Sequence, residues 1–341
     1  SRQEDEMEKK KIVIGVDGGS TKTAVRVADL DGVTLATATY QGGGTNLHAA
    51  GNKDAVVRVL NQAIDDALRR IPAVRRERSR PEDYDIVAAC VGTAGLDQPD
   101  DAELHRSVFV QCRSLRGISL NVVSDVAIIA DCGTAPVRVC LIAGTGSNCY
   151  AARFDQDGQP LNEAYVGGLD LTVADDGSAA WVAHEAFREA VYAVTARDRP
   201  TQLGIALCRR FDIDPNGPND WRRLKGVRGR LTKRQLAALS ADIIAPLADR
   251  GDRVAMEIFH EAGVRLARMA SGALKRLGTP RTRKTERREA LLVGGMWENA
   301  FVQKTFTRCM QRTTDIRLVR VHDPTVGAIR IALRRAKRSI G

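Results

Sequence analysis

The residues best suited to chemistry lie in two short turns, one in each half of the chain. The first turn reads Gly18-Gly19-Ser20-Thr21-Lys22-Thr23, and the second reads Gly144-Thr145-Gly146-Ser147-Asn148-Cys149. Glycine lets a backbone approach a ligand closely, and backbone N–H groups and hydroxyls both bind phosphate oxygens. Two such turns facing each other would hold a polyphosphate from both sides. Two ordinary hairpins left by an old duplication are the alternative.

Two carboxylates stand where predicted strands end. Asp125 follows a short apolar strand, and a carboxylate there can accept the proton of a hydroxyl that attacks a γ-phosphoryl group. Asp is also a favoured N-cap, so capping of a helix that begins near Val126 is the competing interpretation. Asp17 ends the strand before the first turn, where it could hold Mg²⁺ directly or through water. The alternative is that Asp17 is a structural residue whose carboxylate forms hydrogen bonds within the turn.

The segments around the two turns repeat without a gap. Aligning Gly18 with Gly144 also aligns two Asp-x-Asp-Gly turns, at 29–32 and 155–158. Asp-Gly between β-rich runs favours a hairpin, so each half is predicted to open with a three-stranded antiparallel meander. Apolar spacing predicts strands at 11–16, 86–91, 118–123, 137–143 and 290–293 and helices at 53–70 and 254–274. The expected result is two similar α/β domains with mixed sheets and a cleft between them.

The composition excludes several classes of protein. The 341 residues include 52 Lys and Arg against 42 Asp and Glu, a formal charge of +10. That length suggests about two domains, and an apolar share of 43% excludes wholesale disorder. An aromatic share of 4% argues against a stacking surface for single-stranded nucleic acid. No nucleic-acid-binding pattern accompanies the basic segments, which look like loops or helix ends, so no such partner is expected. These segments are 69–80, 221–234, 275–288 and 334–338.

Membrane insertion and metal–thiol chemistry are not expected either. The chain has no run of 18 apolar residues, and its charged start at Ser1–Lys11 is unlike a secretory signal peptide. Seven scattered cysteines without CxxC spacing favour buried free thiols in a reducing compartment, and hence a cytoplasmic protein. The histidines show no HExxH spacing, and neither a Walker A motif nor a strand-linked GxGxxG occurs.

Several motifs, in order along the chain, resemble those of a known family. The run Gly15-Val16-Asp17-Gly18-Gly19-Ser20-Thr21-Lys22-Thr23 resembles the first phosphate loop of the actin/hexokinase/heat-shock-chaperone ATPase superfamily. Within it, residues from about Lys11 to Arg335 resemble the N-acetylglucosamine kinases of the BadF/BadG/BcrA/BcrD-like branch. The further motifs are Gly43-Gly44-Thr45-Asn46, Val91-Gly92-Thr93-Ala94-Gly95, Val123-Ser124-Asp125, the second turn from Ala143, Asp175-Asp176-Gly177-Ser178-Ala179-Ala180-Trp181, Val293-Gly294-Gly295 and Asp323-Pro324-Thr325-Val326-Gly327-Ala328.

The resemblance implies an α/β protein with two ribonuclease-H-like, actin/hexokinase-type domains around a central cleft. It implies a disordered N-terminal extension at 1–10, an N-terminal domain at 11–135 and a C-terminal domain at 136–324. A C-terminal helix at about 325–338 can pack back on the N-terminal domain. The implied activity is that of a homodimer that uses ATP and Mg²⁺ to phosphorylate the 6-hydroxyl of N-acetylglucosamine, giving N-acetylglucosamine 6-phosphate and ADP.

The resemblance also assigns roles to individual residues. Asp125 would be the catalytic base and contact the sugar, and Asp17 would hold the metal. The other sugar ligands would be Asn46, Ser147, Asn148, Gly168 and Asp175, together with the rest of the segment 168–172. The nucleotide contacts would be Gly18, Gly19, Thr21, Lys22, Gly144, Thr145, Gly146, Ala248, Gly294, Gly295 and Asn299. A turn role for Asn46 and a helix-cap role for Gly294 are the alternatives.

The chain departs from the family in the sugar-binding segment. Gly168-Leu169-Asp170 stands where many relatives have Gly-Trp-Gly, and Ala174 stands where Gly is usual. Neither change affects the residues expected to transfer the phosphoryl group, but both lie where the sugar would bind, so the identity of the sugar is not fixed. Glucosamine and N-acetylmuramate kinases are therefore alternatives. Two other functional classes remain as competitors. An activator ATPase of a radical dehydratase would need cysteines spaced for an iron–sulfur cluster, and a non-catalytic sugar sensor would need a DNA-binding module.

Overall fold

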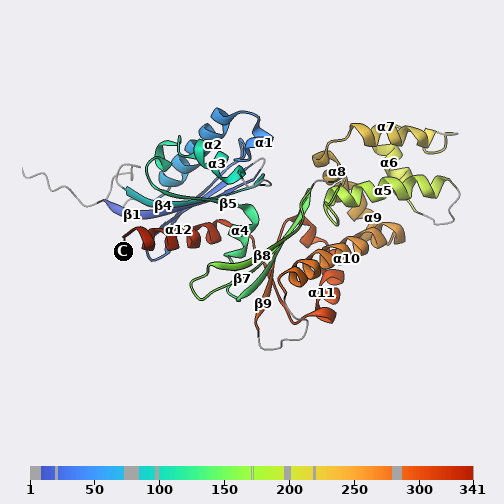
Figure 1. Cartoon of the computed structure of the whole chain (residues 1–341). Helices are drawn as coiled ribbons and strands as arrows, with labels where there is room; N and C mark the ends of the chain where they lie inside the picture. Colours follow the sequence, from blue (N-terminus) through green and yellow to red (C-terminus); the bar gives the residue numbers. More distant parts are fainter. Residues whose placement is uncertain are drawn as a thin grey trace, which may run out of the picture. The chain divides into compact units, whose positions relative to one another are not determined.

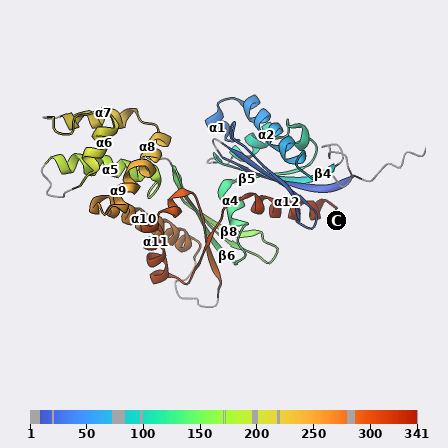
Figure 2. The ribbon, with the colours of Figure 1, turned by 180° about the vertical axis from the view of Figure 1, so that it is seen from behind.

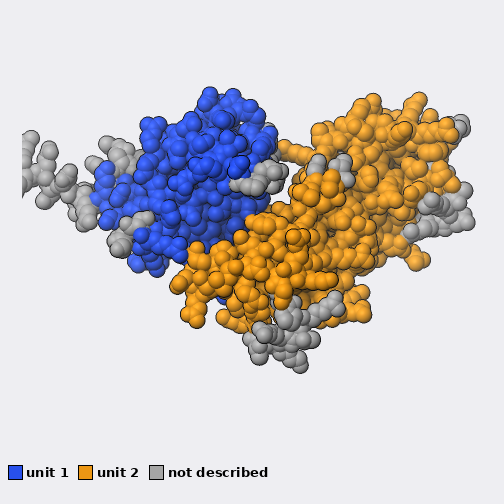
Figure 3. All heavy atoms as spheres, viewed as in Figure 1, with its two compact units in different colours: residues 1–134, 321–341 blue, residues 135–320 orange. Residues whose placement is uncertain are grey.

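The computed structural model describes residues 9–19, 22–72, 84–96, 100–169, 171, 173–195, 201–217, 220–278 and 286–340. Residues 1–8 of the expected extension and Thr21 of the first turn lie outside these ranges. The chain forms two compact units, shown in different colours in Figure 3. Unit 1 contains residues 1–134 and 321–341, and unit 2 contains residues 135–320.

Unit 1 is built on a five-stranded mixed sheet with the order β3-β2-β1-β4-β5. The first three strands pair antiparallel, which confirms the meander predicted from the Asp-Gly turn. β4 and β5 run parallel to β1, so the carboxyl ends of β1, β4 and β5 share one edge. The strands are β1 (Lys10–Gly18), β2 (Thr23–Asp29), β3 (Thr34–Tyr40), β4 (Tyr84–Thr93) and β5 (Ser119–Ser124).

Helices cover both faces of this sheet. Alternation along β1 sends Ile12, Ile14 and Val16 into the core shared with α2, and sends Val13 into a second core with α4 and α12. Figures 1 and 2 show α12 running along the sheet on the face away from α2. The helices of unit 1 are α1 (Leu47–Ala50), α2 (Lys53–Leu68), α3 (Asp101–Phe109), α4 (Asp125–Ala130) and α12 (Thr325–Ile340), with a 3-10 turn at Arg113–Leu115.

Unit 2 repeats the same sheet, with the order β10-β9-β6-β7-β8. Its first three strands again form an antiparallel meander, and β9 and β10 are parallel to β6. The two sheets therefore match strand for strand, as the sequence repeat predicts. The strands are β6 (Val137–Ala143), β7 (Ser147–Phe154), β8 (Pro160–Gly167), β9 (Arg288–Val293) and β10 (Arg317–Arg320).

The helices of unit 2 enclose one continuous hydrophobic core. The longest helix, α10, buries an apolar face of Ala, Leu, Ile and Phe residues against the sheet and α11. The helices of this unit are α5 (Ala179–Val194), α6 (Leu203–Arg210), α7 (Arg223–Arg230), α8 (Lys233–Leu239), α9 (Ala245–Asp249), α10 (Arg253–Arg276) and α11 (Ala300–Thr313). Short 3-10 turns occupy Asp220–Arg222 and Gly295–Glu298, and a π-helical turn, Ser240–Ile244, joins α8 to α9.

The basic segment 221–234 differs from its expected form. It was expected to be loop or helix end, yet it contains the whole of α7. This helix buries only Leu224 and includes Gly226 and Gly229, so it lacks the apolar stripe that identifies a helix in a sequence.

All seven cysteines are free thiols; five are buried as predicted, while Cys132 and Cys309 are partly exposed. Burial raises the pKa of Cys112 to about 12 and that of Cys132 to about 11, so both remain protonated near neutral pH.

Within the described residues, no helix combines the length and apolar character that crossing a bilayer requires. The same residues hold no group of three or more His, Cys, Asp or Glu side chains placed to bind a metal.

Candidate functional site

The first turn of unit 1 is fixed by contacts between three strand ends. Thr45 and Thr93 are both fully buried, and their hydroxyl oxygens lie 2.7 Å apart in a hydrogen bond. The backbone N–H of Thr45 donates to Gly19 O at 3.1 Å, and that of Ala94 donates to Gly18 O at 3.3 Å. A Cβ atom on Gly18 would lie 1.8 Å from Thr45 Oγ1, so no other residue fits there. The turn ends at Lys22, which is exposed.

Asp17 and Asp125 are brought into electrostatic contact at the carboxyl ends of β1 and β5. The pKa of Asp17 is raised to about 6, by burial first and then by the charges of Asp125 and Asp323, while Lys22 opposes the shift. Asp125 is the first residue of α4, and its Oδ1 accepts the N–H of Val126 at 2.9 Å. Ser124 holds the N-cap position without a side-chain capping bond, and it is the carboxylate of Asp125 that binds an N–H of the first turn of the helix, so a helix-end role and a catalytic role are compatible for Asp125.

Helix α4, which carries Asp125, is held between β4 and α12 by two glycines. A Cβ atom on Gly92 would lie 2.5 Å from Ile128 Cδ1. A Cβ atom on Gly327 would lie 1.7 Å from the backbone oxygen of Ile128, which cannot move without moving the helix. The family-like motif 323–328 thus has a packing explanation: its glycine lets α12 approach α4 closely.

Asp323 is a residue of this site that sequence reasoning did not assign. It lies in the motif 323–328, whose residue types give no sign of a role for its carboxylate. Burial opposes ionisation of Asp323, but hydrogen bonds from Thr325 and Arg26 outweigh it and lower the pKa of this carboxyl. An ionised Asp323 therefore faces Asp17 and adds to the negative potential there.

Asn46 lies on the segment that follows β3, close to the end of β4. Its Oδ1 accepts the N–H of His48 at 3.0 Å. The next residue, Leu47, donates its N–H to Nε2 of the fully buried His105, at 3.3 Å. Gly95 has φ of +84°, and a Cβ atom there would lie 2.6 Å from Asn46 Oδ1. Asn46 is thus held by α3 on one side and by the end of β4 on the other.

The second turn, in unit 2, is tied to the start of α5. Gly144 O accepts the N–H of Ala179 at 2.9 Å, and Thr145 O accepts that of Ala180 at 3.3 Å. Gly294 packs against the turn from β9: its φ is +108°, and a Cβ atom on it would lie 2.3 Å from the backbone oxygen of Ala143. Close backbone packing, and not a helix C-cap, is therefore what requires this glycine. Thr145 itself is exposed.

The predicted sugar ligands of unit 2 lie together beside this turn. Asp175 is 3% exposed, and its Oδ1 accepts the N–H of Ser147 at 3.1 Å. The hydroxyl of Ser147 donates to Asp176 O at 2.8 Å. Gly168 has φ of +76°, and a Cβ atom on it would lie 2.7 Å from the amide carbon of Asn148. Ser147, Asn148, Gly168 and Asp175 therefore form one local cluster.

Lys233 is a second residue that sequence reasoning missed. It begins α8, and its Nζ forms an ion pair with Asp175 Oδ2. Its neighbours Thr232 and Gln235 form a capping box, which marks a helix start and gives no sign of a distant carboxylate. No local pattern in the sequence could have joined Lys233 to Asp175.

The remaining predicted nucleotide residues lie elsewhere in unit 2. Ala248 is buried in the core on α9. Asn299 is the N-cap of α11, where its Oδ1 accepts the N–H groups of Phe301 and Val302. Gly295 begins the 3-10 turn after β9, and a Cβ atom on it would meet nothing within 4 Å. Contacts of these residues with adenine stay a prediction.

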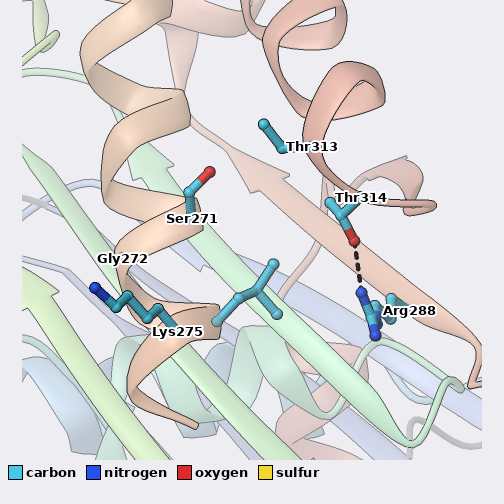
Figure 4. Close-up of a pocket in the computed structure, with 7 residues that line it drawn as sticks. Ser271, Gly272, Lys275, Arg288, Thr313 and Thr314 are labelled. Carbon is cyan, nitrogen blue, oxygen red and sulfur yellow. Dashed lines mark hydrogen bonds between the residues drawn. The ribbon is translucent and has the colours of Figure 1, made fainter. Parts of the chain in front are cut away.

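A cavity of about 440 Å³ also lies in unit 2, away from the predicted residues. It is lined by the end of α10, the start of β9 and the end of α11. Figure 4 shows Arg288 pointing to Thr314, to whose Oγ1 it donates at 2.7 Å, while the ammonium of Lys275 points away from that pair. The cationic side chains lining the cavity thus do not converge on one point.

The donor groups suit a nucleotide with a divalent cation. Carboxylate oxygens are the ligands that Mg²⁺ prefers. Burial and the charges of Asp125 and Asp323 raise the pKa of Asp17, and a cation beside it would offset that repulsion. Backbone N–H groups and hydroxyls at the two turns suit phosphate oxygens. The residues present therefore fit both ATP and Mg²⁺.

Two matched five-stranded sheets, each opening with a meander and a glycine-rich turn, define the two-domain α/β fold of actin and hexokinase. The chain belongs to the BadF/BadG/BcrA/BcrD ATPase family, whose model matches residues 14–332. This membership confirms the family predicted from the motifs.

Individual relatives in this family are distant. The chain is 28% identical to an N-acetylmuramic acid/N-acetylglucosamine kinase of Clostridium acetobutylicum over 262 residues, covering 74% of this chain and 76% of that protein. It is 24% identical to an N-acetyl-D-glucosamine kinase of Dictyostelium discoideum, covering 96% and 99%. Among solved structures, a protein of Chromobacterium violaceum provisionally named N-acetylglucosamine kinase is similar in fold. Its TM-score is 0.65 at 21% identity, over 94% of this chain and 98% of that one.

Proposed function

We propose that the protein is an ATP-dependent sugar kinase that phosphorylates the 6-hydroxyl of N-acetylglucosamine, giving N-acetylglucosamine 6-phosphate and ADP. The observation that carries this proposal is Asp125, a carboxylate at the start of α4 in electrostatic contact with Asp17. Family membership supplies the ATP, and the names of two curated relatives supply the amino sugar. A homodimer, as the family resemblance implies, is part of the proposal.

In this proposal each described residue has one task. Asp125 accepts the proton of the sugar hydroxyl as its oxygen attacks the γ-phosphoryl group. Asp17 holds Mg²⁺, which when bound offsets the charge of the phosphates. Gly18, Gly19 and Lys22 in unit 1, and Gly144, Thr145 and Gly146 in unit 2, bind phosphate oxygens. Thr21 would join them but lies outside the described residues.

The sugar is bound by fixed polar groups. Asn46, Asn148 and Asp175 offer the donors and acceptors that sugar hydroxyls and an acetamido group need. Ser147 and Gly168 support this set through the contacts described above. On the nucleotide, Ala248, Gly294, Gly295 and Asn299 are proposed to lie beside adenine.

N-acetylmuramate is the second candidate substrate. The name of the Clostridium acetobutylicum relative includes both sugars, and this chain has Leu169 where many family members carry Trp. Leu169 is 61% exposed next to Gly168, which leaves room on that side for a sugar with a larger substituent.

A coupled ADP-release assay with ATP and Mg²⁺ tests the proposal. The panel contains N-acetylglucosamine, N-acetylmuramate, glucosamine, N-acetylmannosamine and glucose. We expect turnover with N-acetylglucosamine, and in Asp125→Asn a fall in kcat of about 10²- to 10⁴-fold with sugar binding retained. The matched control is Asp54→Asn, which changes an exposed acid in the first turn of α2.

Two results would contradict the proposal. Folded wild-type protein that binds ATP but turns over no sugar would exclude a kinase for this panel. Turnover by Asp125→Asn at the wild-type rate would leave the kinase standing but remove Asp125 as its base.

A further inference from the structure

Lys233 occupies an unusual position for a lysine at a helix start. It is the first residue of α8, where the partial positive charge of the helix end disfavours a cation. The Thr232–Gln235 capping box binds the backbone N–H groups of Thr232 and Gln235, and a lysine, which has no acceptor atom, cannot add to it. The position of Lys233 is therefore better explained by the contacts of its ammonium group.

The ammonium of Lys233 reaches both a buried carboxylate and the second turn. It pairs with Asp175 Oδ2, while Asp175 Oδ1 is bound to the N–H of Ser147. A Cβ atom on Gly146 would lie 2.8 Å from Lys233 Nζ and 2.9 Å from Asp175 Oδ1. Nζ therefore lies directly beside Gly146, in the turn proposed to bind phosphate.

The two partners of the ion pair differ in access to solvent. The side chain of Asp175 is 3% exposed, whereas that of Lys233 is 36% exposed. A phosphate arriving at the turn thus has access to the ammonium. Asp175 holds the ammonium in place, which reduces the entropy that a flexible lysine would lose on binding an anion.

We propose that Lys233 is a phosphate-binding residue of the second turn, and that its ammonium contacts the terminal phosphates of the bound nucleotide. A lysine ammonium beside a glycine-rich turn is a chemical arrangement suited to phosphate, because a point charge supplements the N–H groups of the backbone. The inference rests on the proposed function in one respect, that Gly144–Gly146 is a phosphate turn. It adds a cation, contributed by α8, that no motif and no comparison assigns.

Calorimetric titration of the full chain with ATP, ADP and AMP, each with Mg²⁺ and without sugar, tests the inference. Lys233→Met should weaken ATP and ADP binding by about ten- to a hundredfold, the loss of a charge-assisted hydrogen bond, and change AMP binding less than about threefold. Lys233→Arg, which keeps the charge, should recover part of the loss. Lys225→Met, at an exposed lysine of α7, is the control and should bind all three nucleotides as the wild type does.

Two further variants separate phosphate binding from a merely structural ion pair. Lys233→Met leaves the Asp175 carboxylate buried without its cation, which can destabilise the fold. The double variant Lys233→Met/Asp175→Asn removes both charges, so it should melt close to the wild type yet still bind ATP weakly. Asp175→Asn alone keeps the ammonium but removes the carboxylate that holds it in place, so it should lose less ATP affinity than Lys233→Met.

The inference is overturned if Lys233→Met binds ATP like the wild type, or if it loses ATP and AMP affinity equally. It is also overturned if Asp175→Asn loses as much ATP affinity as Lys233→Met, since the pair would then be structural only. These measurements use no sugar, so a failure of the proposed sugar kinase and a failure of this inference give different results.

Discussion

The surroundings of Asp17 make ionisation of its carboxyl unfavourable. Its pKa rises from the ordinary value of 3.8 to about 6 because of burial first and the charges of Asp125 and Asp323 second. Between these two pH values the folded chain binds more protons at this site than the unfolded chain does. Stability therefore falls as pH rises through this window, and stays lower above pH 6. A bound divalent cation would remove this penalty.

Replacing Asp17 should accordingly stabilise the metal-free protein at neutral pH. Asp17→Asn removes the buried charge, so we expect its free energy of unfolding at pH 7.5 to exceed that of the wild type by about 1–3 kcal/mol. The difference should vanish near pH 4, and turnover should be lost at both pH values. Urea unfolding in EDTA at the two pH values measures this, with Asp54→Asn as the control. A wild-type protein more stable than Asp17→Asn at pH 7.5 would contradict the sign.

Single residues were predictable where their role is local. Asp17 and Asp125 follow apolar strands, and a strand end is visible in the sequence. Asp323 and Lys233 were missed because their roles depend on partners far away in the chain: Asp323 faces Asp17, and Lys233 pairs with Asp175. The neighbouring sequence of a carboxylate or a lysine does not indicate such a partner, so only the folded structure reveals it.

At the scale of elements, the position of the proposed base depends on how closely α12 approaches α4. Gly327→Ala would place a Cβ atom 1.7 Å from the backbone oxygen of Ile128, so the two helices must separate. We expect a loss of about 1–3 kcal/mol in stability from overpacking. We also expect a fall of about 10²-fold in kcat, because Asp125 moves with its helix.

Gly272→Ala is the matched control for this prediction. Gly272 lies inside α10, and a Cβ atom there would meet nothing within 4 Å. Alanine should therefore stabilise the protein by about 0.5–1 kcal/mol through its better helix propensity, with kcat unchanged. Chemical unfolding and the ADP-release assay measure both quantities. Equal effects of the two substitutions would show that the α4–α12 contact does not position Asp125.

Elements were predictable in proportion to the strength of their pattern. Alternating apolar residues and Asp-Gly turns predict the meanders. The helix predicted at 254–274 is α10 at Arg253–Arg276. The helices α6 to α9 gave no prediction, because they are short and each buries only a few side chains. Their stability comes from packing on α5 and α10, which is tertiary information.

At the scale of the whole molecule, one unit is continuous in sequence and the other is not. Unit 2 is a single stretch, 135–320, and its hydrophobic core is drawn entirely from that stretch. Unit 1 is completed only when the chain returns at residue 321. One of its cores joins Val13, Ala88 and Ile128 to Ile329 and Ile331 of α12.

This asymmetry predicts which fragments fold. Residues 135–320 alone should unfold cooperatively in urea, whereas 1–134 alone should not, because one face of its sheet has lost α12. Burial of Ile329 and Ile331 contributes about 1.5–3 kcal/mol each, a large part of a net stability of about 5–15 kcal/mol. Joining 321–341 to residue 134 through a flexible linker should restore a cooperative transition, measured by circular dichroism. A cooperative transition in 1–134 without α12 would show that the core shared with α2 suffices, and that the chain's return serves only to position α4.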